Sequence, residues 1–115
     1  MGNLDGKVAL VTGAGGMRGV GRATALKLAS QGASLAITDV HRPASDLPPA
    51  ELRQEWNSID SVSDEIKDLG ASAHPIYADL SKSEEIQSMI EQVVSHYGRL
   101  DILINNARAV IGRDK

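Results

Sequence analysis

A glycine-rich stretch near the N-terminus has the clearest chemical meaning in this sequence. Residues 12–22 read TGAGGMRGVGR, between the apolar run 8–11 and a segment rich in Ala and Leu. A glycine-rich turn between a strand and a helix presents backbone N–H groups and the positive end of the helix dipole to an anion, and glycine lets the anion come close. No Lys-Ser or Lys-Thr pair follows the turn, which argues against the P-loop of a kinase or ATPase. The pattern predicts a phosphate-binding loop, with a flexible turn as the alternative.

Polar side chains follow three other apolar runs. Asp39 comes after residues 34–38, Asp79 after residues 73–77, and Asn105 with Asn106 after residues 100–104. Carboxylates and amides at the ends of strands are placed to hydrogen-bond a ligand, although Asp is also a common turn residue. For Asp79 the turn interpretation is stronger than it is for Asp39.

Four apolar runs and three helical segments must position these residues. The runs 8–11, 34–38, 73–77 and 100–104 are apolar on both faces, as in strands of a parallel sheet that is covered on both sides. Helices are predicted over residues 19–31, 59–69 and 82–97, and Ser81 with Glu84 is expected to form a capping box for the last of them. The resulting β-α-β-α-β-α-β order predicts an α/β fold with a doubly wound parallel sheet.

Composition limits the classes of function. The chain has 115 residues, 12 Lys and Arg against 15 Asp and Glu, and 42% hydrophobic residues. One domain over residues 1–115 is the natural expectation. The net charge of −3 gives no reason to expect nucleic acid or an anionic membrane. No signal segment is visible, so a cytoplasmic location is expected.

Side chains for metal or thiol chemistry are scarce. The chain has no cysteine, which excludes disulfides and thiolate catalysis within it. The three histidines show no metal-ligand spacing and are interpreted as lone surface residues. No metal site is therefore expected.

Taken together, these motifs resemble the short-chain dehydrogenase/reductase family. The family signature Thr-Gly-x-x-x-Gly-x-Gly is similar to residues 12–21, although five residues rather than three separate Gly13 from Gly19. The string LDILINNA at residues 100–107 is the most specific match, and Arg108 replaces the glycine that follows it in the family. The resemblance implies a Rossmann-type doubly wound parallel sheet with strands in the order 3-2-1-4, of which this chain covers the N-terminal part.

The resemblance also implies a set of cofactor contacts. Asp39 would bind the ribose hydroxyls, Asp79 would recognise the adenine amino group, and Leu80 would pack on the adenine ring. Asn105 would steady the sheet, and Gly21 would permit close packing of helix on strand. The residues that would contact the cofactor are Gly13, Arg18, Gly19, Val20, Asp39, Asp79, Leu80, Asn106 and Ala107.

The choice between NAD and NADP depends on opposing charges. A carboxylate at Asp39 accepts hydrogen bonds from the ribose 2′-OH and repels a 2′-phosphate. Arg18 and Arg42 act in the opposite direction because either could pair with that phosphate. We expect NAD rather than NADP.

Residues 41–57 interrupt the rhythm of the fold. They contain three of the four prolines and the only Trp. Because Pro48-Pro49 is incompatible with a helix interior, this segment is predicted to be an insertion on the rim, with one short helix over residues 49–56. Trp56 is expected to cap a small cluster within the insertion, and covering the edge of the adenine is the alternative.

The resemblance implies a hydride transfer between the nicotinamide and a small-molecule alcohol or carbonyl substrate. The family's catalytic Ser and Tyr-x-x-x-Lys lie further along the chain, and neither Tyr77 nor Tyr97 has a Lys four positions on. No catalytic residue is therefore assigned here. A homo-oligomer is expected, and the 115-residue chain alone is expected to be inactive and either to aggregate, to pair with itself through strand 100–104, or to need the rest of a family member. A non-catalytic dinucleotide-binding or regulatory module, or an interaction protein that keeps only the fold, are the alternatives.

Overall fold

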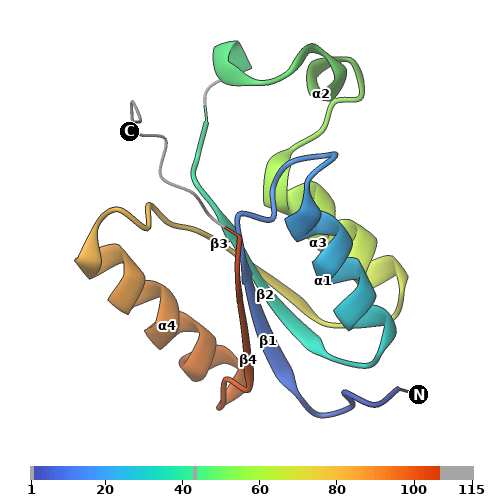
Figure 1. Cartoon of the computed structure of the whole chain (residues 1–115), viewed down its shortest axis with the longest axis vertical. Helices are drawn as coiled ribbons and strands as arrows, with labels where there is room; N and C mark the ends of the chain where they lie inside the picture. The colour runs from blue at the N-terminus through green and yellow to red at the C-terminus, as the bar shows by residue number, and fades with distance from the viewer. Residues whose placement is uncertain (1, 43, 107–115) are drawn as a thin grey trace.

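A parallel sheet forms the centre of the computed structural model, which describes residues 2–42 and 44–106. Its strands are β1 (Val8–Thr12), β2 (Ser34–Asp39), β3 (Ala73–Tyr77) and β4 (Ile102–Asn105), in the order β3-β2-β1-β4. Leu10 lies opposite both Ala36 of β2 and Leu103 of β4. The predicted doubly wound sheet and its strand order are confirmed (Figure 1).

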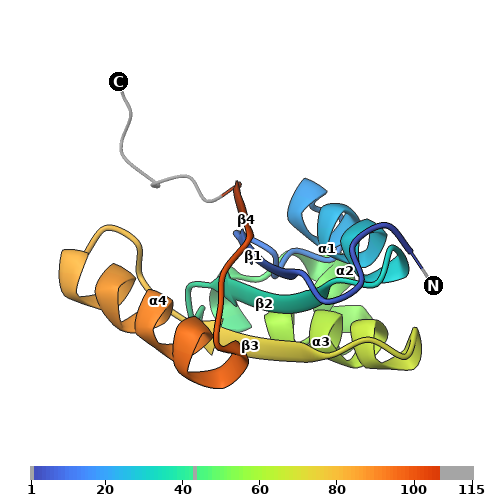
Figure 2. The ribbon, with the colours of Figure 1, turned by 90° about the horizontal axis from the view of Figure 1, so that it is seen from below.

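Helices cover both faces of this sheet. Figure 2 shows α1 (Val20–Ser30) and α3 (Ser58–Asp68) on one face and α4 (Ser83–Tyr97) on the other. The alternation of side chains along β1 produces the two layers: Ala9 and Val11 belong to the core beneath α1 and α3, whereas Val8 and Leu10 belong to the core beneath α4. All four side chains are buried, as their unbroken apolar run predicts.

The ends of α4 show one prediction that is confirmed and one that is wrong. Gly98 ends the helix in the left-handed conformation, with φ of 81°. The expected capping box of Ser81 with Glu84 does not form, because Lys82 is the N-cap residue and makes no side-chain capping bond. The hydroxyl and N–H groups of Ser81 instead donate to Asp79 Oδ1, so the N–H that a capping box would pair with Glu84 is already bound.

The rim segment, residues 44–57, joins β2 to α3. It holds a 3₁₀ turn, η1 (Ala44–Asp46), and the short helix α2 (Pro49–Arg53). Pro49 occupies the first turn of α2, where its missing N–H has no intrahelical partner to lose. α2 and η1 lie beyond the end of the sheet, at the top of Figure 1. No helix within residues 2–42 and 44–106 has the length and hydropathy needed to cross a membrane.

Candidate functional site

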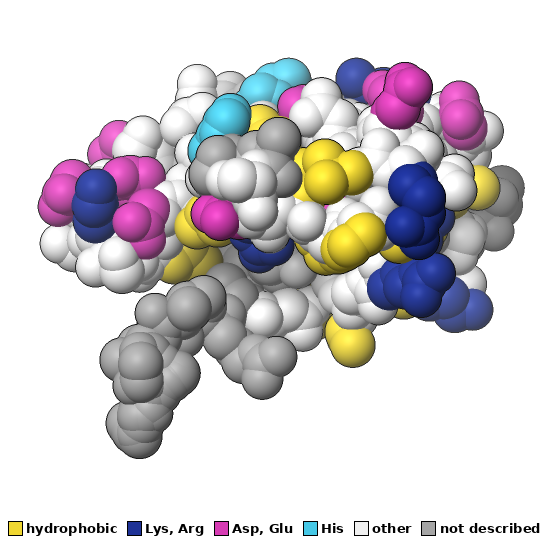
Figure 3. All heavy atoms as spheres, turned by 90° about the horizontal axis from the view of Figure 1, so that it is seen from above, with side chains coloured by type: hydrophobic (Ala, Val, Ile, Leu, Met, Phe, Trp, Pro, Cys, Tyr) yellow, Lys and Arg dark blue, Asp and Glu magenta, His cyan; other side chains and the backbone are white. Residues whose placement is uncertain are grey.

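The candidate site residues meet at the carboxyl edge of the sheet. All strands of the sheet are parallel, so the segments that follow them emerge at the same edge. Gly13 follows β1, Asp39 ends β2, Asp79 follows β3, and Asn106 follows β4. Viewed from this edge, Lys and Arg side chains gather on the side where α1 and α2 lie (Figure 3). Positive charge is therefore present on this side of the edge, which favours an anionic ligand.

The start of α1 has unused hydrogen-bond donors. Gly19 is the N-cap residue and makes no side-chain capping bond, and the first turn carries no acidic side chain. Among the described residues, the N–H groups of Val20, Gly21 and Arg22 donate no hydrogen bond. Val20 is 72% exposed, so solvent and ligands reach this turn. Three free donors at the positive end of a helix are able to bind an anion, such as the pyrophosphate of a dinucleotide.

Two glycines of the loop have conformations or contacts that require glycine. Gly13 has a φ of 66°, in the left-handed region. A Cβ on Gly21 would lie 2.5 Å from the carbonyl oxygen of Gly13 and 2.9 Å from Cα of Ala14. These are backbone atoms, which lack the freedom of a side-chain end to move away. Gly21 therefore allows α1 to pack closely on the loop, as the family resemblance implies.

Asp39 lies at the centre of the site and is already hydrogen-bonded to the loop. Its Oδ2 accepts from the N–H of Gly15 at 2.8 Å, and its Oδ1 accepts from the N–H of Val40 at 2.8 Å. Arg42 Nη2 lies 3.5 Å from Oδ1, and the Asp39 side chain is only 9% exposed. The carboxylate thus holds the loop against the end of β2, and the side chain of Arg18 in the same loop is exposed.

The residues after β3 are tied to the start of α4. Asp79 Oδ1 accepts from both the N–H and the hydroxyl of Ser81, at 3.0 and 2.7 Å. These bonds favour the charged carboxylate, so the pKa of Asp79 is lowered. Leu80 packs against the core beneath α4.

Asn105 and Asn106 end β4 next to the loop. The hydroxyl of Thr12 donates to Asn105 Oδ1 at 2.9 Å and accepts from the N–H of Asn106 at 3.1 Å. Asn105 therefore links β4 to β1, in agreement with the steadying role that the resemblance implies. The side-chain amide nitrogen of Asn106 is buried and has no hydrogen-bond partner in the described part of the chain. Ala107 and Arg108 lie outside the described residues.

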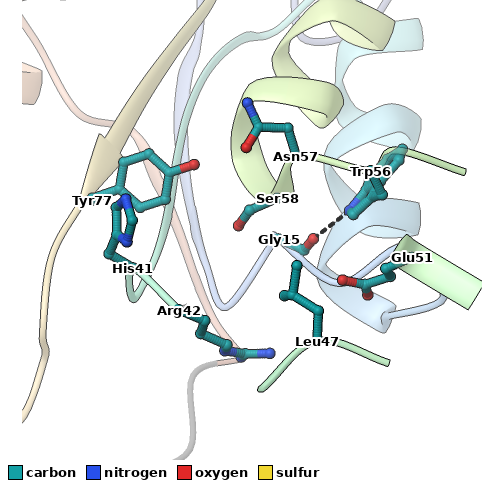
Figure 4. Close-up of a pocket in the computed structure, with 9 residues that line it drawn as sticks. All are labelled: Gly15, His41, Arg42, Leu47, Glu51, Trp56, Asn57, Ser58 and Tyr77. Atoms are coloured by element: carbon teal, nitrogen blue, oxygen red, sulfur yellow. Dashed lines mark hydrogen bonds between the residues drawn. The ribbon is translucent and has the colours of Figure 1, made fainter. Parts of the chain in front are cut away.

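The rim segment contributes contacts that sequence reasoning missed. The indole Nε1 of Trp56 donates to the carbonyl oxygen of Gly15 at 2.7 Å, and Glu51 and Trp56 line the same pocket as Gly15 (Figure 4). Trp56 also packs against the core beneath α1 and α3. The expectation that Trp56 caps a cluster within the insertion is therefore wrong. The partner of Trp56 could not be identified from the sequence, because Gly15 is 41 residues away.

Two of the histidines are paired rather than isolated, which the sequence did not predict. The rings of His74 and His96 stack with their centroids 4.0 Å apart, and the ring of Tyr97 meets both edge-on. The ring of His41 lies 5.2 Å from that of Tyr77 beside the candidate site. Within residues 2–42 and 44–106 no three potential metal ligands of the His, Cys, Asp and Glu types come together.

Comparison with known proteins identifies the family. A family model described as short chain dehydrogenase matches residues 7–114. The chain belongs to this family. Short-chain dehydrogenases and reductases are oxidoreductases, and the glycine-rich loop, the carboxylate after β2 and the strand order described above fit that assignment.

Individual relatives resemble most of this chain but are much longer. The chain is 42% identical to cyclohexanol dehydrogenase from Rhodococcus sp. (strain TK6) over 112 residues, which cover 95% of this chain and 39% of the relative. It is 44% identical to hydroxynaphthalene reductase arp2 from Aspergillus fumigatus, covering 90% and 33%. The structure of carveol dehydrogenase from Mycobacterium avium in complex with NAD has a TM-score of 0.72 and 31% identity, covering 93% and 37%. The chain thus spans less than half the length of these relatives.

Proposed function

We propose that residues 1–115 are the cofactor-binding part of an NAD-dependent short-chain oxidoreductase that interconverts an alcohol and a carbonyl by hydride transfer. The observation that carries this proposal is Asp39: a carboxylate at the end of β2, 9% exposed and hydrogen-bonded to the loop that precedes α1. A carboxylate in this place accepts hydrogen bonds from ribose hydroxyls and repels a 2′-phosphate. The family assignment and the NAD complex of a 31% identical relative support the same conclusion.

The proposed cofactor fits the groups that the structure presents. The free N–H groups of Val20, Gly21 and Arg22 would hold the pyrophosphate, with Gly13 and Gly19 allowing its close approach and Arg18 reaching it from the exposed side of the loop. Asp39 would hold the adenosine ribose, and Asp79 and Leu80 would hold the adenine. Asn106 and Ala107 would line the site beyond β4. The bound nicotinamide would supply the hydride acceptor, and these residues would orient it.

Arg42 is the main opposing feature for NAD over NADP. Its guanidinium lies 3.5 Å from Asp39 Oδ1 and is about half exposed. Because Asp39 partly neutralises this cation, Arg42 is a weaker partner for a 2′-phosphate than its charge alone indicates.

The proposed substrate class is supported by the name of a relative, cyclohexanol dehydrogenase, which describes an alcohol as the substrate.

Titration of the intact protein with NAD and NADP tests this function. We expect NAD to bind at least about tenfold more tightly than NADP, and Asp39→Ala to cost about 1–3 kcal/mol of NAD binding free energy. Asp39→Asn keeps an acceptor but removes the charge, so it should narrow the preference for NAD. Asp64→Ala, on the exposed side of α3, is the matched control. Tighter binding of NADP by about tenfold would reject the role of Asp39.

A further inference from the structure

Both backbone groups of Met17, in the middle of the glycine-rich loop, are held by side chains from other elements. Its N–H donates to Glu51 Oε2 of α2 at 3.0 Å. Its carbonyl oxygen accepts from Arg22 Nη1 of α1 at 2.7 Å. A loop residue with both polar groups engaged in this way has little freedom to rotate its peptide planes.

Gly15 is held in the same manner two residues earlier. Its N–H donates to Asp39 Oδ2 at 2.8 Å, and its carbonyl oxygen accepts from Trp56 Nε1 at 2.7 Å (Figure 4). Two alternate residues of the loop are therefore fixed by side chains from β2, α1 and the rim segment. Among the described residues, the N–H groups of Gly16, between them, and of Arg18, after Met17, make no hydrogen bond.

The side chains that hold the loop also support one another. Arg22 lies over the ring of Trp56, with its guanidinium carbon 5.0 Å from the ring centroid. Arg22 Nε also donates to Glu65 Oε1 of α3 at 2.8 Å, in an ion pair that raises the pKa of Arg22. The Arg22 guanidinium is thereby fixed from three sides.

Glu51 is the least expected member of this group. It is only 7% exposed, and in the described part of the chain its carboxylate makes a single hydrogen bond, to Met17. Burial of a carboxylate costs free energy unless its hydrogen bonds compensate. The short helix α2 thus buries its one acidic side chain against a loop amide, and this hydrogen bond offsets part of the cost of burial.

We propose that the rim segment, residues 44–57, is a positioning element of the cofactor site. Glu51 and Trp56 hold the lengthened phosphate loop in its binding shape before the dinucleotide arrives. The loop has two residues more than the family signature, so it has more peptide groups to restrain, and the rim segment supplies two of their partners, Glu51 and Trp56. The pyrophosphate then binds without having to order the loop, which reduces the entropic cost of binding. The identity of the ligand rests on the proposed function; the restraint of the loop does not.

The first test needs no cofactor. Amide hydrogen exchange over residues 13–19 is measured for the intact protein without substitutions and for the variants Glu51→Ala and Glu51→Gln. The control is Gln54→Ala, which removes an exposed side chain at the end of the same helix. We expect faster exchange in Glu51→Ala only, because Gln retains an acceptor for the Met17 N–H. Equal exchange in Glu51→Ala and the control would overturn the proposal, as would Glu51→Gln behaving like Glu51→Ala.

The second test measures NAD affinity by calorimetry in the same variants and in Trp56→Phe. Loss of one loop contact should weaken binding about tenfold in Glu51→Ala and about threefold in Trp56→Phe, which keeps the ring but loses the donor. Glu51→Gln should stay within about twofold of the unaltered protein. Unchanged affinity in Glu51→Ala would reject a positioning role. If the exchange pattern holds but no variant and no parent binds a dinucleotide, the restraint of the loop stands and the proposed function fails.

Discussion

Trp56 and Asp39 are linked through the backbone of Gly15: Trp56 Nε1 donates to the Gly15 carbonyl oxygen, and the Gly15 N–H donates to Asp39 Oδ2. Asp39 is thus both the proposed ribose ligand and part of the support of the loop. Removal of its carboxylate would affect both roles at once. The comparison of Asp39→Asn with Asp39→Ala separates the charge from the hydrogen bond.

Two glycines of the loop are predicted to respond oppositely to substitution. Gly21→Ala places a Cβ 2.5 Å from the Gly13 carbonyl oxygen, so we expect a loss of about 1–3 kcal/mol in the free energy of unfolding. Gly19→Val adds a Cβ whose nearest atom is 3.5 Å away, at a φ of −85° that any residue adopts. The fold should therefore survive, while the branched side chain blocks the anion site. Urea unfolding and NAD titration of both variants check this, and undiminished NAD binding by Gly19→Val would remove the loop from the site.

Asp101 is predicted to stabilise the fold above acidic pH. Its Oδ2 accepts from the N–H of Val8 at 2.8 Å, and Arg99 donates to both of its carboxylate oxygens. The bonds from Arg99 and Val8 lower the pKa of Asp101 below its ordinary value of about 3.9. The stabilisation is therefore complete above about pH 4 and is lost as pH falls through the lower pKa of the folded state.

The variant Asp101→Asn tests this pH dependence. We expect it to be less stable than the parent at neutral pH, with a difference that shrinks below about pH 4 as the parent becomes protonated. Asp64→Asn, an exposed carboxylate with no hydrogen bond in the structure, should show no such trend. A stability difference that stays constant down to about pH 2 would contradict the prediction.

The stacked pair of His74 on β3 and His96 on α4 predicts a loss of stability in mild acid. Burial lowers the pKa of His74, and a charged His96 lowers it further. Between the pKa of the unfolded chain, about 6.5, and the lower value of the folded state, the unfolded chain binds the extra proton. Stability should therefore fall as pH drops through 6.5 and level off below the folded pKa. The other ring facing the pair is the neutral Tyr97, and Ala36 lies opposite His74 on β2.

Replacement of the neighbouring histidine provides the measurement. Unfolding by urea between about pH 7.5 and 5 should show a smaller loss of stability in His96→Gln than in the parent, because the charge beside His74 is gone. His41→Gln, which leaves the stacked pair intact, serves as the control. Identical pH profiles for His96→Gln and the parent would show that the pair is not coupled.

The sheet could be predicted from the sequence, whereas the support of the site could not. Continuous apolar runs identify buried parallel strands, and Pro49 marks the start of α2, because these signals are local. The burial of Glu51 depends on a loop that approaches from 34 residues away, and the short segment Pro49–Arg53 carries no local sign of it. The capping box failed for a local reason: Asp79 accepts from the N–H of Ser81, and Glu85, not Glu84, accepts from the Asp79 N–H.

The outer edge of β4 gives the last prediction. In the described residues β4 pairs with β1 alone, and Leu103 at its centre is 57% exposed. Ile86 and Val94 of α4 are 39% and 44% exposed, so apolar surface remains open near the α4 side of the sheet. A strand edge with unpaired backbone groups and an exposed apolar side chain promotes pairing between chains.

We therefore expect residues 1–115, expressed by themselves, to self-associate through β4. Light scattering over a range of concentrations should show species larger than a monomer. Leu103→Lys should raise the concentration at which these species form by about tenfold, because a charge on the strand opposes edge pairing. Leu52→Lys, at a similarly exposed leucine on α2, is the matched control. A parent chain that stays monomeric at every concentration and melts cooperatively would show that the edge of β4 needs no partner.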